Sequence, residues 1–479
     1  HHAMKNCFAI LITMLFFTAS PAVADTFSPV PSPNPWVDDY EALAPAEHYL
    51  SWGTYNIHDP SIRFADGYYY MYTTDAMYRT GHRDAKRKGI DMGFIPIRRS
   101  KDLVNWEFVG WVFPAIPSEA VEWVRSHAGP RSASNIWAPF FAEHDGVYRL
   151  YYCVSAFGKN TSYIGLAEAT SPAGPWTDRG CVVKTDRTSA MNAIDPSVIE
   201  DADGRWWMHY GSYFGGLFCV ELDPATGFTK RPGDQGHITT SLANYKSNNL
   251  EAPEVMYNPA NKQYYLFVSY GPLMSNYNVR VGRSPRAEEG YTDFFGKEMV
   301  DTTDNYPILT TPYRFDSHKG WAGTAHCTVF DDGQGRYFMA HQGRLAPDNM
   351  KMCLHLREMF FTPSGWPVVS PERYAGTPSR HFTVGDLAGE WEVMRVRELA
   401  SDDGVNTSEH RLLSADGTVG DGGNWRFAEE GQLLTLELDG ETVGDLVVFA
   451  GHDWERETDT VLFTGLDASG RSVWGKRVK

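Results

Sequence analysis

Three carboxylic acids and one histidine occupy comparable places in the sequence and could act together as a hydrolytic site. Asp59 and Asp195 each precede a Pro-Ser pair, Glu251 precedes Ala-Pro, and His326 lies in a similar short apolar stretch. An Asp before Pro often does no more than start a turn. Three acids around one cavity, however, repel each other and shift each other's pKa values. Because this repulsion destabilises the fold, such a cluster indicates a functional site. Opposed carboxyls suit glycoside hydrolysis, in which one group protonates the leaving oxygen and another activates water or attacks the sugar.

A shared cavity is expected because these residues belong to an internal repeat. Each repeat reads as a short apolar strand, a turn rich in Asp, Asn or Gly, and a strand of aromatic and β-branched residues, which is typical of a β-hairpin. The aligned positions are separated by 79, 57, 57 and 74 residues. Such intervals hold about four strands each. The aligned positions are Asp59, Ala138, Asp195, Ala252 and His326.

Five such repeats predict an all-β fold that begins with a five-bladed β-propeller over residues 50–376. The first strand of each blade is then innermost, so the aligned residues face a small central cavity. After a linker near Tyr374, turn signals between alternating strands predict a small C-terminal antiparallel β-barrel or sandwich domain over residues 383–479. The Pro-rich residues 25–49 are expected to form an N-terminal strap along the surface.

Residues 1–24 are interpreted as a tag remnant, His1 to Ala3, followed by a signal peptide. The apolar run from Phe8 to Thr18 is too short to span a bilayer, and Ala22-Val23-Ala24 suits a cleavage site. We therefore predict cleavage before Asp25 and a secreted or periplasmic protein. A buried N-terminal strand is the alternative for this segment.

Cysteine usage favours small core residues over a disulfide framework. Beyond Cys7 in the signal segment, five cysteines remain, an odd number at scattered positions with no zinc-binding spacing, and most have apolar or aromatic neighbours.

The composition narrows the class of partner. The formal net charge is −17, so nucleic acid and anionic membrane surfaces would repel the chain. No membrane span is expected. A neutral partner fits better, and the aromatic share of 14% suits both β-rich packing and stacking against sugar faces.

The repeat motifs resemble the arabinanase branch of glycoside hydrolase family 43. The strings HDPSI, SNIWAP, NAIDPS, YGSYFGGL, LEAPEV and GTAHCTVF occur in this order and cover the whole expected propeller. The tail is similar to the small C-terminal β-domain of longer members. The resemblance implies a five-bladed, inverting endo-α-1,5-L-arabinanase that acts on arabinan, a side-chain polysaccharide of pectin. We expect it to act as a monomer.

The resemblance also implies roles for individual residues. Asp59 matches the general base, Glu251 the general acid, and Asp195 the carboxylate that tunes the acid's pKa and holds it in position. Inversion would need base and acid roughly 6.5–9.5 Å apart, to admit a water. His326 matches a histidine that helps hold one calcium ion at the hub, completed mostly by waters, although calcium ordinarily prefers oxygen ligands.

The same comparison implies a set of substrate contacts. Phe140 departs from the pattern, because many relatives carry Asp there and a polar contact near that blade would be missing. The matched contact positions are His58, Trp137, Gly158, Asn192, Ser212, Tyr213 and Phe214.

Three other functions compete with this interpretation. Retaining fructan and sucrose hydrolases also use three acids, but they carry NDPNG, RDP and EC motifs that this chain lacks. An exo-acting arabinanase, an arabinofuranosidase or a β-xylosidase of the same family would differ in loops that close one end of the cleft, and residues 74–100 form an insertion long enough to do this. A non-catalytic sugar-binding propeller would not need all three acids.

Overall fold

The computed structural model describes residues 39–243, 248–316, 318–399, 404–420 and 422–479. The predicted signal peptide, its cleavage site and the first part of the strap lie outside these ranges. The regular secondary structure of the described part consists mainly of β-strands, as predicted. None of its helices is long and apolar enough to cross a lipid bilayer.

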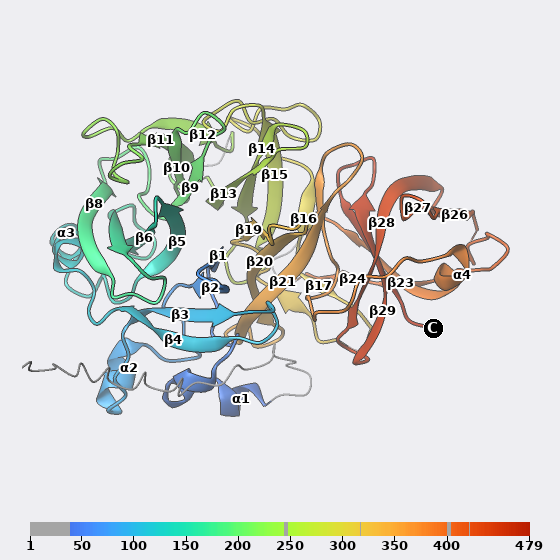
Figure 1. Ribbon diagram of the computed structural model, residues 1–479, viewed down its shortest axis with the longest axis horizontal. Coiled ribbons are helices and arrows are strands. Elements are labelled where there is room, and N and C mark those ends of the chain that lie inside the picture. The colour runs from blue at the N-terminus through green and yellow to red at the C-terminus, as the bar shows by residue number, and fades with distance from the viewer. Residues whose placement is uncertain (1–38, 244–247, 317, 400–403, 421) are drawn as a thin grey trace, which may run out of the picture.

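Four antiparallel four-stranded sheets follow one another along the chain, and each pairs its strands in sequence order or its reverse. Figure 1 shows them side by side around a common centre, with the first strand of each toward the middle. This is the arrangement of propeller blades. The sheets are β1 (Ser61–Ala65), β2 (Tyr68–Tyr72), β3 (Phe94–Ser100) and β4 (Glu107–Phe113); β5 (Trp137–His144), β6 (Val147–Ser155), β7 (Ser162–Ala169) and β8 (Thr177–Thr185); β9 (Ser197–Glu200), β10 (Trp206–Tyr210), β11 (Leu217–Leu222) and β12 (His237–Thr240); and β13 (Leu250–Asn258), β14 (Gln263–Tyr270), β15 (Asn278–Ser284) and β16 (Ile308–Thr310).

The fifth repeat does not form a separate four-stranded sheet. Its strands β19 (Thr328–Asp331), β20 (Tyr337–Leu345), β21 (Met352–Phe361) and β22 (Pro367–Val369) pair antiparallel in sequence order. The same sheet continues from β20 through β18 (Trp321–Ala322) and β17 (Tyr313–Arg314) to β24 (Asn406–Thr407), so it holds seven strands. The difference arises because β18 pairs with β20, β17 pairs with β18, and β24, from the C-terminal part of the chain, pairs in parallel with β17.

All five aligned repeat positions share one unusual backbone conformation. Their φ angles lie between 38° and 57°, in the left-handed region that residues other than glycine seldom adopt. Each kink lies at the inner end of the first strand of its repeat. Strain of this kind persists where the surroundings enforce it, often at functional sites. The five positions are Asp59, Ala138, Asp195, Ala252 and His326.

Side chains from neighbouring sheets hold these kinks in place. The backbone N–H of Ala138 donates to Thr74 Oγ1 (2.7 Å), and that of His326 donates to Ser269 Oγ (2.8 Å). The N–H of Asp59 donates to Gln342 Oε1 on β20 (2.9 Å). The last repeat is therefore bonded directly to the first.

A shared apolar core also joins the first sheet to the last repeat. Ile62, Met71 and Trp106 pack in one buried cluster with Phe338 and Leu354. Such sheet-to-sheet burial is the main favourable contribution to a fold of this kind.

The C-terminal domain is a single seven-stranded antiparallel sheet that curls around its own core. Trp425 on one edge strand and Leu413 on the other belong to the same buried cluster, which requires the sheet to bend. A short helix, α4 (Val384–Leu387), precedes it. In order across the sheet the strands are β25 (Glu409–Leu413), β23 (Gly389–Val396), β30 (Ser472–Arg477), β29 (Thr458–Leu466), β28 (Glu441–Asp453), β27 (Leu433–Leu438) and β26 (Trp425–Ala428).

A buried ionic cluster joins this domain to the propeller-like part. The Lys476 ammonium, which is fully buried, lies 2.7 Å from Glu455, 3.0 Å from Asp453 and 3.6 Å from Glu372. Glu372 follows β22, whereas the other three residues belong to the C-terminal domain. The charges cross the domain boundary, so the two domains are held together by more than the linker.

The remaining elements lie outside the sheets. The described end of the predicted strap forms α1 (Tyr40–Leu43) and η1 (Ala46–Ser51), and the insertion of the first repeat contains α2 (His82–Arg87). The helix α3 (Ser118–Ala128) joins the first and second sheets. The five cysteines beyond Cys7 are free and at least half-buried, which confirms their prediction as core residues.

Candidate active site

Asp59 lies at the centre of a small cluster of polar groups. Thr74 Oγ1 donates a hydrogen bond of 2.6 Å to its Oδ2. Its Oδ1 lies 2.9 Å from His58 Nδ1 and 2.8 Å from His326 Nδ1. Burial alone would raise the pKa of Asp59, but the positive charge of His326 and the hydrogen bonds from His326 and His58 hold this pKa well below its usual range. Asp59 is therefore ionised at neutral pH.

Two residues on β20 fix His58. Arg344 Nη2 lies 2.8 Å from His58 Nε2, and Gln342 Nε2 lies 3.4 Å from the same nitrogen. A guanidinium can only donate, so Nε2 accepts and the ring proton lies on Nδ1, facing Asp59. Burial lowers the pKa of His58, which keeps its ring neutral. In this tautomer His58 orients the Asp59 carboxylate without neutralising it.

His326 supplies positive charge opposite the acids. Burial disfavours its charged form, but the carboxylates of Asp59 and Asp195 outweigh this effect and raise the pKa of His326 to about 9. Asp59 belongs to the first repeat and His326 to the last, so their contact requires these two repeats to lie side by side.

Asp195 has the opposite electrostatic character to Asp59. It is 6% exposed and accepts a hydrogen bond from the backbone N–H of Ala252. Burial raises the pKa of Asp195 well above its usual range, and the charges of Glu251 and Asp59 raise it further against the influence of His326. These surroundings therefore favour the protonated form of Asp195. Their surroundings thus push the pKa values of the two aspartates in opposite directions.

Glu251, on β13, is held by two short hydrogen bonds. Ser212 Oγ donates to its Oε2 (2.5 Å), and Tyr277 OH donates to its Oε1 (2.6 Å). Burial and the charges of Glu251 and Asp195 raise the pKa of Tyr277 well above its usual range, so this phenol keeps its proton and donates. Both carboxylate oxygens are thus fixed in direction.

The predicted substrate contacts fall into two groups. His58 and Ser212 touch the acids directly, and Tyr213 lies close enough to Glu251 for its charge to contribute to raising the pKa of Tyr213 to about 12, after burial. The others have no hydrogen bond to an acidic side chain among the described residues: Trp137 bonds Asn135, Asn192 accepts from Ser162, Phe214 accepts from Asn248 through its carbonyl, and Gly158 lies in an exposed turn.

An ion pair and a hydrogen bond link the first strands of three repeats. Arg63 on β1 donates to Glu254 Oε1 on β13 (2.9 Å) and to Thr328 Oγ1 on β19 (2.9 Å). Its guanidinium lies over the ring of Phe140, 5.0 Å from the centroid. Phe140, where many relatives carry Asp, is buried and packs against a cation.

Sequence reasoning missed the residues that hold the acids. Thr74, Tyr277, Gln342 and Arg344 were not singled out, although Thr74 and Gln342 lie within the recognised repeats. One signal could have found some of them, because Thr74, Ser269 and Gln342 recur at or beside the second strand of their repeats and each bonds the next kink.

His326 is the predicted calcium ligand at the hub. Nδ1 of His326 faces Asp59, so a metal would bind this ring only at Nε2, and only after Nε2 has lost the proton that the raised pKa favours. Of the described residues, only two groups bring three ligand atoms together, and neither contains His326. One group, Glu372 with Asp453 and Glu455, surrounds the Lys476 ammonium instead. The hub thus offers one imidazole and a negative field, which fits an ion bound mainly by water.

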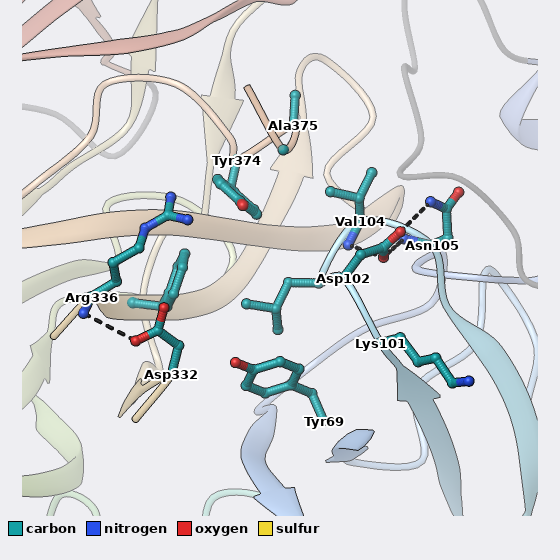
Figure 2. Close-up of a pocket in the computed structure, with 12 residues that line it drawn as sticks. Tyr69, Lys101, Asp102, Val104, Asn105, Asp332, Arg336, Tyr374 and Ala375 are labelled. Carbon is teal, nitrogen blue, oxygen red and sulfur yellow. Dashed lines mark hydrogen bonds between the residues drawn. The ribbon is translucent and has the colours of Figure 1, made fainter. Parts of the chain in front are cut away.

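A pocket of about 440 Å³ lies away from these residues. Figure 2 shows Tyr69 and Tyr374 on opposite sides of it, with Arg336 beside Tyr374. Tyr69 follows the β1–β2 turn and Asp332 follows β19, so the pocket is at the opposite end of these strands from Asp59 and His326. It contains none of the predicted site residues.

Comparison with known proteins agrees with this geometry. Residues 53–367 match the model of glycosyl hydrolases family 43, and residues 371–475 match a C-terminal lipocalin-like domain. An extracellular endo-α-(1→5)-L-arabinanase of Thermotoga petrophila is 28% identical, covering 91% of this chain and 96% of that protein. An extracellular endo-α-(1→5)-L-arabinanase of Bacillus subtilis is also 28% identical, covering 88% of this chain and 93% of that protein.

Solved structures give the same result. The crystal structure of the endo-1,5-α-L-arabinanase from Thermotoga petrophila superposes with a TM-score of 0.76 at 27% identity and covers 89% of this chain and 99% of that one. Since the family model matches well over half of the sequence, the chain belongs to glycosyl hydrolase family 43, and it carries a C-terminal lipocalin-like domain.

Proposed function

We propose that this glycosidase is an endo-α-1,5-L-arabinanase that inverts the configuration at the cleaved sugar. The observation that carries the proposal is the pair of aspartates from different sheets whose pKa values are pushed in opposite directions, with Glu251 held beside them. Relatives that match nearly the whole chain are named for this activity, which supports arabinan as the substrate.

The mechanism follows from the protonation states. Ionised Asp59 takes a proton from a water that attacks the anomeric carbon. Glu251 gives a proton to the glycosidic oxygen as the carbon–oxygen bond breaks, so one hydroxyl forms on each product. Burial and the nearby charge of Glu251 favour the protonated form of Asp195, so this residue adds no second negative charge beside Glu251. A calcium ion held through His326 would supply positive charge close to the acids.

The fold details that remain proposals are consistent with this reaction. The five kinks and the bond from Gln342 to Asp59 support a five-bladed ring over residues 50–376, with β19–β22 as its last blade. The curled sheet over residues 383–479 is a barrel-like domain. The protein acts as a monomer that is secreted or periplasmic, which fits the extracellular relatives.

Product analysis tests the function. Linear debranched arabinan is digested, and chain lengths are resolved over time. Endo cleavage yields a mixture of intermediate oligosaccharides from the start, with inverted configuration by NMR. A single short product from the outset would indicate an exo-acting enzyme, and the absence of products would overturn the proposal.

Two variants test the roles. Asp59→Ala and Glu251→Ala are each expected to lower turnover by about three orders of magnitude or more while the fold is kept. Asp332→Ala, at the opposite end of the first strands, serves as the control. Near-native activity of either acid variant would remove that residue from the mechanism.

A further inference from the structure

A second cavity, of about 680 Å³, lies between α2 and α3 and is lined by residues of the first two repeats. Asp75 and Asn135 form part of its wall. Asp75 follows β2 and Asn135 precedes β5, so both lie at the end of these strands that also carries Asp59 and Ala138. The cavity therefore opens on the same face as the acids.

Asn135 connects the cavity to the candidate active site. Its Oδ1 accepts from Trp137 Nε1 (2.8 Å), and its Nδ2 donates to the backbone carbonyl of Asp75 (3.1 Å). Trp137 was predicted to stack on substrate, and it is one residue from the kink at Ala138. A polysaccharide chain that leaves the hub past Trp137 would meet this cavity next.

The cavity is strongly basic, in contrast to the chain as a whole. Four arginines line it against one exposed acid, Asp84, in a protein of formal net charge −17. Arg87 pairs with Asp84 at 3.3 Å. The lining arginines are Arg83, Arg87, Arg125 and Arg131.

The other acid of the cavity does not neutralise these arginines. Both oxygens of Asp75 accept from backbone N–H groups, of Ile95 (2.7 Å) and Ile136 (2.8 Å). Burial raises the pKa of Asp75 to about 8, so it is mainly uncharged at neutral pH. Throughout the described chain, no carboxylate forms an ion pair with Arg83 or Arg131. Two guanidinium groups are therefore available to an outside anion.

The cavity also has an apolar wall beside its arginines. Phe94 lines the cavity and stacks on His82 at 4.2 Å between ring centroids, and Ile116 and Val121 lie nearby. A flat apolar surface accepts the face of a sugar ring, and guanidinium groups bind a carboxylate through paired hydrogen bonds. The ligand that combines both features is a sugar that carries a carboxylate.

We propose that the cavity between α2 and α3 is a subsite for a uronic acid residue, through which the enzyme recognises acidic sugar units near its neutral substrate. This deepens the proposed function and rests on it for the nature of the polysaccharide. Arg83 and Arg131 bind the carboxylate, and Phe94 contacts the ring.

Binding of oligogalacturonate to the full-length enzyme tests the subsite, by calorimetry at low ionic strength. Replacing two arginines by glutamine, as R83Q with R131Q, is expected to raise Kd about tenfold or more. The control pair R231Q with R286Q removes the same charge from two exposed arginines that line no part of the cavity, and leaves Kd unchanged. Reduced oligosaccharides, whose carboxylates have become alcohols, are expected not to bind.

Three outcomes would overturn the proposal: no binding by the unaltered enzyme, equal loss in both double variants, or displacement by inorganic phosphate at the same affinity, which would mean a general anion site. Hydrolysis of neutral arabinan is measured in parallel and is expected to be unchanged in R83Q with R131Q. Because binding is read without turnover, failure of the subsite is distinguishable from failure of the arabinanase activity.

Discussion

Replacing Tyr277 with phenylalanine removes one of the two hydrogen bonds that hold the candidate acid. The phenol donates to Glu251 Oε1 at 2.6 Å from a fully buried position, while Ser212 still holds Oε2. A hydrogen bond to a charged group contributes about 1.5–3 kcal/mol. If this energy is needed when Glu251 delivers its proton, kcat falls by about 10- to 150-fold. KM changes little, because the substrate does not depend on this bond.

The assay is initial-rate kinetics on debranched arabinan, with kcat and KM determined separately. Tyr270→Phe is the matched control, since the Tyr270 hydroxyl is also buried and donates at 2.6 Å, but to Asn305 rather than to an acid. We expect the control to keep kcat within about twofold. If Tyr277→Phe behaves like the control, or if only its KM rises, the positioning of Glu251 by Tyr277 is refuted.

Three other perturbations follow from the described contacts. Lys476→Met leaves the buried carboxylates uncompensated and should lower the free energy of unfolding by about 3 kcal/mol or more, read from denaturant midpoints; an unchanged midpoint would contradict the ionic cluster. The folded-state pKa of Asp75 is about 8, above its ordinary 3.8, so the folded protein holds this proton more tightly and stability declines as pH rises from about 4 through 8. Asp75→Asn should remove that slope from thermal midpoints measured between pH 5 and 8.5, and parallel profiles for variant and parent would count against it. His326→Ala should lower the calcium content found by elemental analysis and should make the rate less sensitive to chelator. If the unaltered enzyme contains no calcium and its rate does not respond to chelator, the proposed calcium site is wrong.

Much of the fold could be predicted because each repeat has a recognisable local sequence pattern. Turn residues and alternating aromatic strands mark each hairpin, and five copies align without any knowledge of distant contacts. The extension of the last sheet could not be predicted in this way. Asn406 and Thr407 pair with β17 across roughly ninety residues of chain, and two residues carry no periodicity that would indicate a strand.

Some features of the candidate site could be predicted from the repeat, and others could not. Asp59, Asp195, Glu251 and His326 could be placed together because the repeat puts them at equivalent positions. The sequence could not predict which acid favours its protonated form, because the raised pKa of Asp195 depends on burial and on the charges of neighbours from other sheets. Tyr277 was missed for a related reason, because it comes just before a third strand and occupies no repeated position.

The bond from Gln342 to the N–H of Asp59 joins two residues that are 283 positions apart. All three acids have been synthesised long before Gln342 leaves the ribosome, yet the backbone N–H of Asp59 gains this acceptor only when the last repeat has been made. Activity is thus a late event in the maturation of this enzyme. The same bond makes hydrolysis a sensitive reporter of ring integrity, since an opening confined to the seam between first and last sheets would silence the enzyme while most of its secondary structure stayed intact.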